Sequence, residues 1–342
     1  MVKFRMLLFL SILSFLTGCS QQNGSQTTPD KLNGLSFVAS PNPLEQLYLD
    51  PVLQINANTT AIMPFGFIRN LEAPEIVHDT DSQWFGETAA GAKQYIQKLH
   101  ANKLSVMMKP QIWIWHGEFT GFLKMTTEED WKILENSYTE FIMTYACLAE
   151  ELDVAIFCIG TELEQFIIHR PAYWSLLISE IKKVYKGKLT YAANWDEYKD
   201  VPFWKDLDFI GVDAYFPVSE NKTPSVEEAR QGWQPWKEEM LAVSVAVNKK
   251  ILFTEYGYRS VDFAGKEPWK YVRSMKIVNL EAQTNLMQAV FEEVYQEPWF
   301  AGGYIWKWFV DHDKVGGSEN NQFTPQNKPV ETLIKEHFKI ME

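Results

Sequence analysis

The sequence contains little histidine and little cysteine, with six His and three Cys among 342 residues. These residues show no cluster with the spacing of a zinc site, and only His116 follows the end of a predicted strand. A metal-dependent hydrolase that cleaves phosphate or amide bonds needs clustered ligands of this kind. That class of enzyme is therefore disfavoured, and we expect neither a metal ion nor an organic cofactor.

Two of the cysteines lie in apolar patterns. Cys147 falls in a helical stretch and Cys158 in a strand-like run, so both are expected to be small buried hydrophobic residues. A disulfide between them is the less favoured alternative in an oxidising compartment.

Positive charge is also scarce, because 44 Asp and Glu outnumber 32 Lys and Arg and give a net charge of −12. A nucleic-acid partner is disfavoured, since phosphate binding requires a surplus of basic residues. Electrostatic docking on anionic lipid is disfavoured for the same reason. An uncharged glycan suits an acidic protein without any special arrangement.

The N-terminal residues are not expected to belong to the fold. Lys3 and Arg5 precede an apolar run at 6–15, which is too short for a stable membrane span and is typical of a secretory signal. The following Leu16-Thr17-Gly18-Cys19 resembles a bacterial lipobox, which implies cleavage before Cys19 and lipidation of that residue. We predict a lipoprotein signal peptide at 1–19 and a flexible polar tether at 20–31.

Ser20, which follows the predicted lipidated cysteine, is not acidic. This resembles the pattern of lipoproteins that are sorted to the outer membrane of a Gram-negative bacterium. The expected location is therefore the cell envelope, with a lipid anchor in the membrane. An ordinary signal peptide with a chance cysteine is the alternative, and periplasmic or surface display is left open.

Eight short apolar runs alternate with longer helical patterns over 32–342. Most are nearly continuous in hydrophobic or β-branched residues, as in parallel strands that are buried on both faces. This alternation predicts one (β/α)₈ barrel domain. A doubly wound open sheet is the alternative, but 34–42 lacks the glycine-rich phosphate loop that would favour it. The runs are 34–39, 60–68, 104–109, 154–160, 189–194, 209–214, 251–255 and 302–308.

The helical patterns carry their own boundary signals. Thr127 and Asp130 resemble a capping box at the start of 126–152, and Pro171 favours the first turn of 171–185. Further helices are expected at 87–102, 225–247, 280–296 and 329–338, with a weaker one near 44–55 and at most a short one in 197–207.

Two of the apolar runs end in a glutamate. Glu162 follows the fourth run and Glu255 ends the seventh. A carboxylate at the end of a hydrophobic strand is costly unless it is paired or used. Because barrel active sites lie at the C-terminal strand ends, the two glutamates are expected to face each other across the mouth. The pair suggests glycoside hydrolysis, whereas a single such glutamate would be interpreted as a salt-bridged structural residue.

Aromatic residues recur at the other strand ends. Sugars are bound by aromatic platforms together with a few polar groups that fix their orientation. Trp306 in the eighth run and Trp113 after the third are the strongest candidates for such platforms. Trp115, Trp195 and Trp308 are undecided between sugar binding and packing.

The strand-end motifs together resemble glycoside hydrolase family 113, which belongs to clan A of the retaining barrel glycosidases. Their order on successive strands makes the resemblance more specific than any single motif, and it extends from about Gly34 to the C-terminal helix. The motifs are Met108-Lys109-Pro110-Gln111-Ile112-Trp113, Ile159-Gly160-Thr161-Glu162-Leu163, the stretch from Asp208 to Pro217, and Phe253-Thr254-Glu255-Tyr256-Gly257-Tyr258.

The resemblance implies roles for the matching residues. Glu162 matches the acid/base and Glu255 the nucleophile. Tyr215 is placed like the tyrosine that hydrogen-bonds the nucleophile, and Trp306 matches the platform under the reacting sugar.

Other positions are implied less directly. Asn194 and Lys109 match polar positions that line the cleft, and Arg69 is a further candidate for a place near the nucleophile. Thr161 stands at a position where most of the clan has Asn. Family 113 resembles this chain there, and the difference from the clan leaves open which group contacts the sugar 2-hydroxyl.

The known activity of the family is endo-acting hydrolysis of β-1,4-mannan, so the resemblance implies a retaining β-mannanase. The same barrel acting on another β-glycan, such as glucan or xylan, is the alternative among enzymes. A non-catalytic lipoprotein that captures glycan at the cell surface is the alternative among binding proteins, although it would be expected to lose one of the two glutamates. We expect a monomer that binds a polysaccharide or oligosaccharide; subsite number and endo or exo action are left open.

Overall fold

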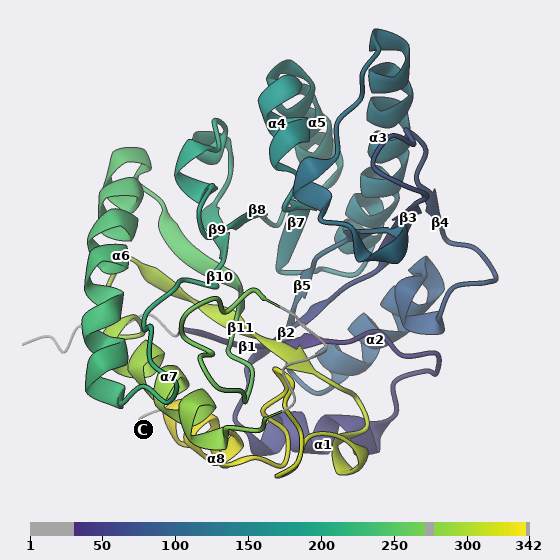
Figure 1. The fold of residues 1–342 in the computed structure, drawn as a ribbon. Coiled ribbons are helices and arrows are strands. Elements are labelled where there is room, and N and C mark those ends of the chain that lie inside the picture. Colours follow the sequence, from purple (N-terminus) through teal and green to yellow (C-terminus); the bar gives the residue numbers. More distant parts are fainter. Residues whose placement is uncertain (1–30, 271–276, 340–342) are drawn as a thin grey trace, which may run out of the picture. The chain divides into compact units, whose positions relative to one another are not determined.

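Eight parallel strands close into a barrel within the residues that the computed structural model describes, 31–270 and 277–339. Around the ring their order is β1, β11, β10, β9, β8, β7, β5 and β2 (Figure 1). The predicted (β/α)₈ barrel is confirmed. The predicted signal peptide with Cys19, and the tether up to residue 30, lie outside the described residues. The barrel strands are β1 (Leu32–Phe37), β2 (Thr59–Ile62), β5 (Ser105–Met108), β7 (Ile156–Thr161), β8 (Lys188–Asn194), β9 (Phe209–Asp213), β10 (Lys250–Tyr256) and β11 (Phe300–Trp308).

The inside of the barrel is filled with side chains. Ala61, Met107, Leu252 and Tyr304 come from four different strands and are fully buried in one hydrophobic cluster. Gly34 leaves room for the ring of Tyr304, because a Cβ at this glycine would lie 2.4 Å from Cδ1 of the tyrosine. Since the interior is closed in this way, a substrate can reach the barrel only at an end.

Helices surround the strands, and their starts follow the expected capping chemistry. The hydroxyl of Thr127 accepts a hydrogen bond from the backbone N–H of Asp130 at the start of α3, and Ser225 forms a capping box with Glu228 at the start of α6. The α-helices are α1 (Gln46–Gln54), α2 (Ala89–Ala101), α3 (Glu128–Glu151), α4 (Glu164–His169), α5 (Pro171–Val184), α6 (Val226–Val247), α7 (Leu280–Glu293) and α8 (Pro329–His337). Short 3₁₀ helices are η1 (Phe85–Glu87), η2 (Trp115–Gly117), η3 (Thr120–Phe122), η4 (Tyr198–Asp200), η5 (Trp204–Asp206) and η6 (His312–Lys314).

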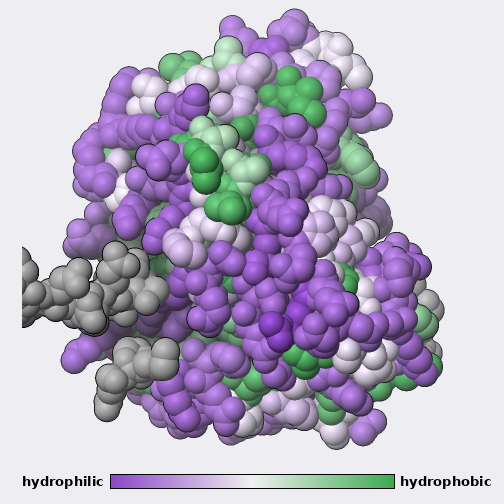
Figure 2. Space-filling view, turned by 90° about the vertical axis from the view of Figure 1, so that its left-hand side faces the viewer, coloured by the Kyte–Doolittle hydropathy of each residue, from purple (hydrophilic) through white to green (hydrophobic). Residues whose placement is uncertain are grey.

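The side of the barrel that carries α6 is mainly hydrophilic. Figure 2 views the side on which α6 lies in Figure 1 and shows small hydrophobic patches among hydrophilic residues. Leu241 and Val245, on α6, are among the exposed apolar residues. Within the described ranges no helix is long and apolar enough to span a membrane.

Two strands do not end where the sequence suggested. The run 60–68 breaks at Pro64, and a similar break follows at Pro110, because proline cannot donate a ladder hydrogen bond. Beyond the prolines the chain continues as β3 (Phe65–Ile68) and β6 (Gln111–Ile114), which pair with each other outside the barrel ring. A short β4 (Val77–His78) completes this three-stranded sheet. The extension positions Trp113 beyond the barrel end.

The remaining differences are local. Helix α4, directly after Glu162, was not predicted, and the segment 197–207 forms the two 3₁₀ helices η4 and η5. Both Cys147 and Cys158 are unpaired. Cys158 is buried as expected, but the prediction for Cys147 was wrong, because it lies on the exposed face of α3.

Candidate active site

The two predicted glutamates both lie at the C-terminal ends of barrel strands. Glu162 follows β7 directly, and Glu255 is the penultimate residue of β10. Strands β8 and β9 lie between them in the ring. Their last residues are in register, because Asn194 pairs with Asp213, which pairs with Glu255. The mouth therefore brings these polar side chains to one level.

The carboxylate of Glu255 is surrounded by hydrogen-bond donors. Lys109 Nζ lies 2.6 Å from its Oε1, and Gln111 Nε2 donates to the same oxygen at 3.1 Å. The hydroxyl of Tyr215 donates to Oε2 at 2.7 Å. Both oxygens thus accept hydrogen bonds, as an ionised carboxylate can, and the side chain is fixed on two sides.

Lys109 connects Glu255 to a second buried acid. Its ammonium group is fully buried and also lies 3.2 Å from Oδ1 of Asp213, which accepts a further hydrogen bond from Thr254 at 2.8 Å. Burial opposes the charge of Lys109, but Asp213 and Glu255 outweigh this effect and raise its pKa. Burial and the charge of Glu255 raise the pKa of Asp213 to about 7, against the opposing effect of Lys109.

Glu162 has different surroundings. Its backbone lies in the left-handed region, with φ of 49°, and its N–H donates to the carbonyl of Ala192 at 2.8 Å. Among the described residues, its carboxyl group forms no salt bridge. Burial, and then the charges of Asp213 and Glu255, raise its pKa well above the usual range. This raised pKa favours the protonated form of the carboxyl group, although the residue keeps some contact with solvent.

A cleft with a volume of about 390 Å³ lies beside the group of residues around Glu255. It borders Glu255 through Gln111, and both predicted platforms, Trp306 and Trp113, line it. Trp113 is 50% exposed, whereas Trp306 is partly buried and precedes Lys307 through a cis peptide bond. The lining residues are Val38, Ala39, Met63, Phe65, Phe67, Trp84, Glu87, Gln111, Trp113, Trp306 and Lys307. Large aromatic surfaces with a few polar groups are what a pyranose ring requires.

Lys307 provides a cation in this cleft. Its ammonium lies 5.7 Å from the ring centre of Trp306 and 5.3 Å from that of Phe309. Burial lowers its pKa, although the charge of Glu255 acts in the opposite direction. The group can donate hydrogen bonds to a ligand that rests on Trp306.

Asn194 lies at the mouth, at the end of β8, as predicted. Its Oδ1 accepts a hydrogen bond from the N–H of Trp195, and its own N–H donates to Glu197. Burial raises the pKa of Glu197 to about 7. The hydrogen bond from Asn194 acts to lower this pKa, and nearby carboxylates act to raise it. Glu197 is therefore a further acid, besides Asp213, whose charge acts on Glu162.

The three tryptophans whose role was undecided have different surroundings in the structure. Trp308 is fully buried and belongs to the hydrophobic core. Trp115 is 63% exposed and does not line the cleft. Trp195 stacks on Trp269 with a ring separation of 5.0 Å and also packs against Trp236.

Several residues at the mouth were not singled out from the sequence. Gln111 and Asp213 were present in the strand-end motifs, and the charge of Asp213 at the end of a buried strand was an available signal. Lys307 could have been suspected from its position beside Trp306. Arg69 was wrongly expected near Glu255: it is exposed after β3, and Lys109 is the cation that contacts this carboxylate.

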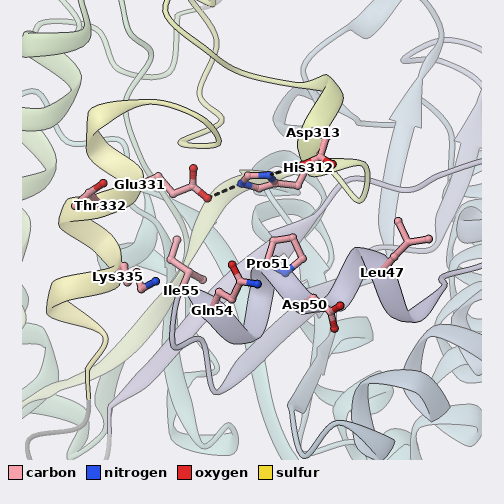
Figure 3. A pocket seen from close by; sticks show the side chains of 10 residues that line it. All are labelled: Leu47, Asp50, Pro51, Gln54, Ile55, His312, Asp313, Glu331, Thr332 and Lys335. Atoms are coloured by element: carbon pink, nitrogen blue, oxygen red, sulfur yellow. Dashed lines mark hydrogen bonds and ion pairs between the residues drawn. The ribbon is translucent and has the colours of Figure 1, made fainter.

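A larger hollow lies elsewhere, between α1, η6 and α8 (Figure 3). Its volume is about 470 Å³, and His312 and Glu331 form a 2.6 Å contact at its edge. No residue that contacts Glu255 lines this hollow, whereas Gln111 lines the smaller cleft, so size alone does not identify the site. In the described ranges no group of three or more His, Cys, Asp or Glu is arranged to hold a metal ion.

Comparison with known proteins agrees with this geometry. The family model of Glycoside Hydrolase Family 113 matches residues 40–328. A family 113 β-mannanase from Alicyclobacillus acidocaldarius, solved with ManMIm, is 23% identical, with 90% of this chain and 97% of that chain covered and a TM-score of 0.75. A family 113 β-1,4-mannanase solved as a complex is 20% identical, with 90% and 99% covered and a TM-score of 0.77.

A more distant enzyme shares the barrel alone. The β-glucuronidase of Ruminococcus gnavus is 12% identical, with 91% of this chain and 50% of that chain covered and a TM-score of 0.63. A search of curated proteins found no match. Because the family model spans most of the chain and the fold agrees, this protein is a glycoside hydrolase that belongs to family 113.

Proposed function

We propose that this enzyme cleaves β-1,4-mannan with retention of configuration, with Glu255 as nucleophile and Glu162 as acid/base. The observation that carries the proposal is the difference between the two carboxyl environments. Three donors contact Glu255, which suits a carboxylate that attacks carbon. Glu162 has a raised pKa, which suits an acid that donates a proton at neutral pH.

The reaction proceeds in two displacements. An oxygen of Glu255 bonds to the anomeric carbon while the bond from that carbon to the glycosidic oxygen breaks, and Glu162 transfers its proton to the departing oxygen. Glu162, now ionised, then takes a proton from water, whose oxygen bonds to the anomeric carbon and releases Glu255 as a carboxylate. Two inversions at one carbon give net retention.

This mechanism requires a short separation between the two carboxyl groups. Retaining enzymes have about 5–5.5 Å between them, whereas inverting enzymes have roughly 6.5–9.5 Å to admit a water molecule. We predict the short separation for Glu162 and Glu255, which a crystal structure with a bound inhibitor would measure.

The choice of β-mannan rests on family membership and on the chemistry of the cleft. Trp306, Trp113 and Trp84 give broad apolar surfaces for sugar rings, while Gln111 and Lys307 donate hydrogen bonds to hydroxyl groups. Two of the similar structures are β-mannanases by name. Asn194 is assigned to the polar lining of the same mouth.

A product profile tests the substrate. The purified enzyme is incubated with β-mannan, glucomannan, xylan and mixed-linkage glucan, and the products are separated by chromatography. We expect manno-oligosaccharides from the first two polymers and little release from the others. Preferential cleavage of xylan or glucan would reassign the substrate, and binding without any product would indicate a non-catalytic glycan receptor.

We also propose that Cys19 carries a lipid anchor that holds the enzyme in the cell envelope, in the outer membrane of a Gram-negative bacterium. The support is the Leu16-Thr17-Gly18-Cys19 motif after an apolar run, with Ser20 behind it. Cys19→Ala should move the protein from the membrane fraction to the soluble fraction. Equal membrane association of both forms would contradict the anchor.

A further inference from the structure

The backbone around Glu162 adopts an unusual conformation. Glu162 has φ of 49°, a left-handed value that residues with a side chain rarely adopt. Such a conformation persists only when neighbouring structure holds it, and it commonly occurs at functional sites. The groups that hold this turn therefore control where the carboxyl group points.

Strand β8 provides both of the contacts that hold the turn. The N–H of Glu162 donates to the carbonyl of Ala192 at 2.8 Å. The N–H of the next residue, Leu163, donates to the side-chain hydroxyl of Tyr191 at 2.6 Å. Thus two successive backbone groups at the proposed acid are bound by two successive residues of the neighbouring strand.

The hydroxyl of Tyr191 accepts the hydrogen bond from the N–H of Leu163, in the place of a backbone carbonyl group of β8. The register of β7 and β8 shifts between Cys158 and Thr161, so the ladder is irregular just before the turn. Leu163 is 1% exposed, and its N–H would be a buried donor without an acceptor if the hydroxyl were absent.

The tyrosine ring is itself held firmly. Tyr191 is completely buried and packs edge-on against Trp174 at 5.7 Å and against Phe203 at 5.7 Å. A ring enclosed in this way fixes the position of its hydroxyl. Among the described residues, the N–H of Leu163 is the hydrogen-bond partner of this hydroxyl group.

We infer that Tyr191 is a positioning residue for the acid/base: its hydroxyl fixes the turn at Glu162 so that the carboxyl group is aimed at the glycosidic oxygen. The inference rests on the proposed roles of the two glutamates. It predicts a defect confined to the two proton transfers of Glu162, donation to the leaving oxygen and removal from water, because Glu255 is held by other groups, namely Lys109, Gln111 and Tyr215.

Tyr191→Phe tests this role, because it removes one oxygen and keeps the ring. Two substrates are compared: a manno-oligosaccharide, whose leaving sugar needs a proton, and an aryl β-mannoside with a nitrophenolate leaving group, which needs none. We expect kcat/KM for the oligosaccharide to fall about tenfold or more, through kcat and with KM little changed. We expect kcat/KM for the aryl substrate, which reports glycosylation alone, to change less than about twofold.

Tyr185→Phe is the matched control. Tyr185 is also buried, and its hydroxyl donates to the carbonyl of Val154, just before the start of β7 and at the opposite end of that strand from Glu162. The two variants should lose similar melting temperature, but the control should show no difference between the two substrates. Equal losses on both substrates in Tyr191→Phe, or a selective loss in Tyr185→Phe, would overturn the inference.

A double-variant cycle separates this inference from the proposed function. In a Glu162→Ala background there is no acid to aim, so adding Tyr191→Phe should change the rate on the aryl substrate by less than about twofold. A further large loss would show that the tyrosine acts independently of Glu162 and would reject the inference. If Glu162→Ala itself leaves oligosaccharide hydrolysis intact, the assignment of the acid fails instead.

Discussion

The two glutamates of the barrel mouth have the same chemistry and similar positions, but their neighbours differ. Glu255 contacts the ammonium of Lys109, the amide of Gln111 and the hydroxyl of Tyr215. Glu162 has a raised pKa from burial and nearby acids, and its backbone rather than its carboxyl group is held. The comparison teaches that the surroundings of a carboxyl group, more than its place in the barrel, favour one role over the other.

The largest effect is expected at Glu255. Glu255→Gln keeps the size of the side chain but removes the nucleophile, so kcat on mannan should fall by about 10⁴-fold or more. Steady-state kinetics measure the loss, and a circular dichroism melt checks that the variant is folded. Residual activity within about tenfold of wild type would remove Glu255 from the role of nucleophile.

Glu162→Ala should have a smaller and selective effect. On manno-oligosaccharides the loss should be about 10²–10⁴-fold, and on activated aryl mannosides the first step should be nearly unaffected. Because burial and nearby acids raise the pKa of Glu162, its proton is retained to higher pH, and wild type should lose activity as pH rises through that pKa. The alkaline limb of the pH–rate profile should therefore disappear in the variant for an activated substrate. Persistence of that limb would assign the acid to another group.

Lys109→Met breaks the contact that distinguishes Glu255 from Glu162. Asp213 and Glu255 would then be buried without their cation, and we expect about 3 kcal/mol less stability and about a hundredfold lower kcat. Denaturant unfolding and kinetics measure the two losses separately. Adding Asp213→Asn should restore part of the stability but not the activity, because only the charge repulsion is relieved. Recovery of both would make Lys109 a purely structural residue.

Trp306→Ala tests the sugar platform of the cleft. The ring is partly exposed, so we expect about a tenfold to hundredfold lower kcat/KM with only a small change in melting temperature. Trp115→Ala is the control, because Trp115 is exposed outside the cleft. A large loss of melting temperature with normal kinetics would instead identify Trp306 as a core residue.

The smallest effect is expected at Glu197. Its pKa is raised to about 7 from 4.5, so its contribution to stability is fully present below about pH 4.5 and is lost as pH rises through 7. Glu197→Gln should therefore match wild type near pH 4 and be about 2 kcal/mol more stable at pH 8. Denaturant melts at the two pH values measure this difference.

Much of the fold could be predicted from sequence because its signals are local. Eight buried parallel strands give apolar runs, and helix ends are marked by residues such as Thr127 and Pro171. The breaks at Pro64 and Pro110 were also visible, but their consequence, a separate sheet that carries Trp113, depends on the pairing of β3 with β6. Pairing between distant segments has no local signature.

Part of the candidate site could likewise be predicted from the sequence, and part could not. Glu162, Glu255 and Trp306 could be found because each stands out at the end of an apolar run, and family resemblance added Tyr215, Asn194 and Lys109. The sequence did not reveal that Lys109 contacts both Glu255 and Asp213, or that Tyr191 binds the backbone after Glu162. The contacts of Lys109 join strands that are far apart in sequence, so only the closed barrel brings them together. The contact of Tyr191 joins consecutive barrel strands, but it depends on the irregular register of β7 and β8, which has no local signature in the sequence.

The central claim is the division of roles between Glu162 and Glu255, and azide rescue tests it most directly. Both Glu→Ala variants are incubated with an activated aryl β-mannoside and sodium azide, and the glycosyl azide is analysed by NMR. We predict the inverted α-mannosyl azide from Glu255→Ala, because azide then attacks in place of the missing nucleophile. We predict the retained β-mannosyl azide from Glu162→Ala, because azide intercepts the ester on Glu255. The opposite pairing of products, or one configuration from both variants, would contradict the account.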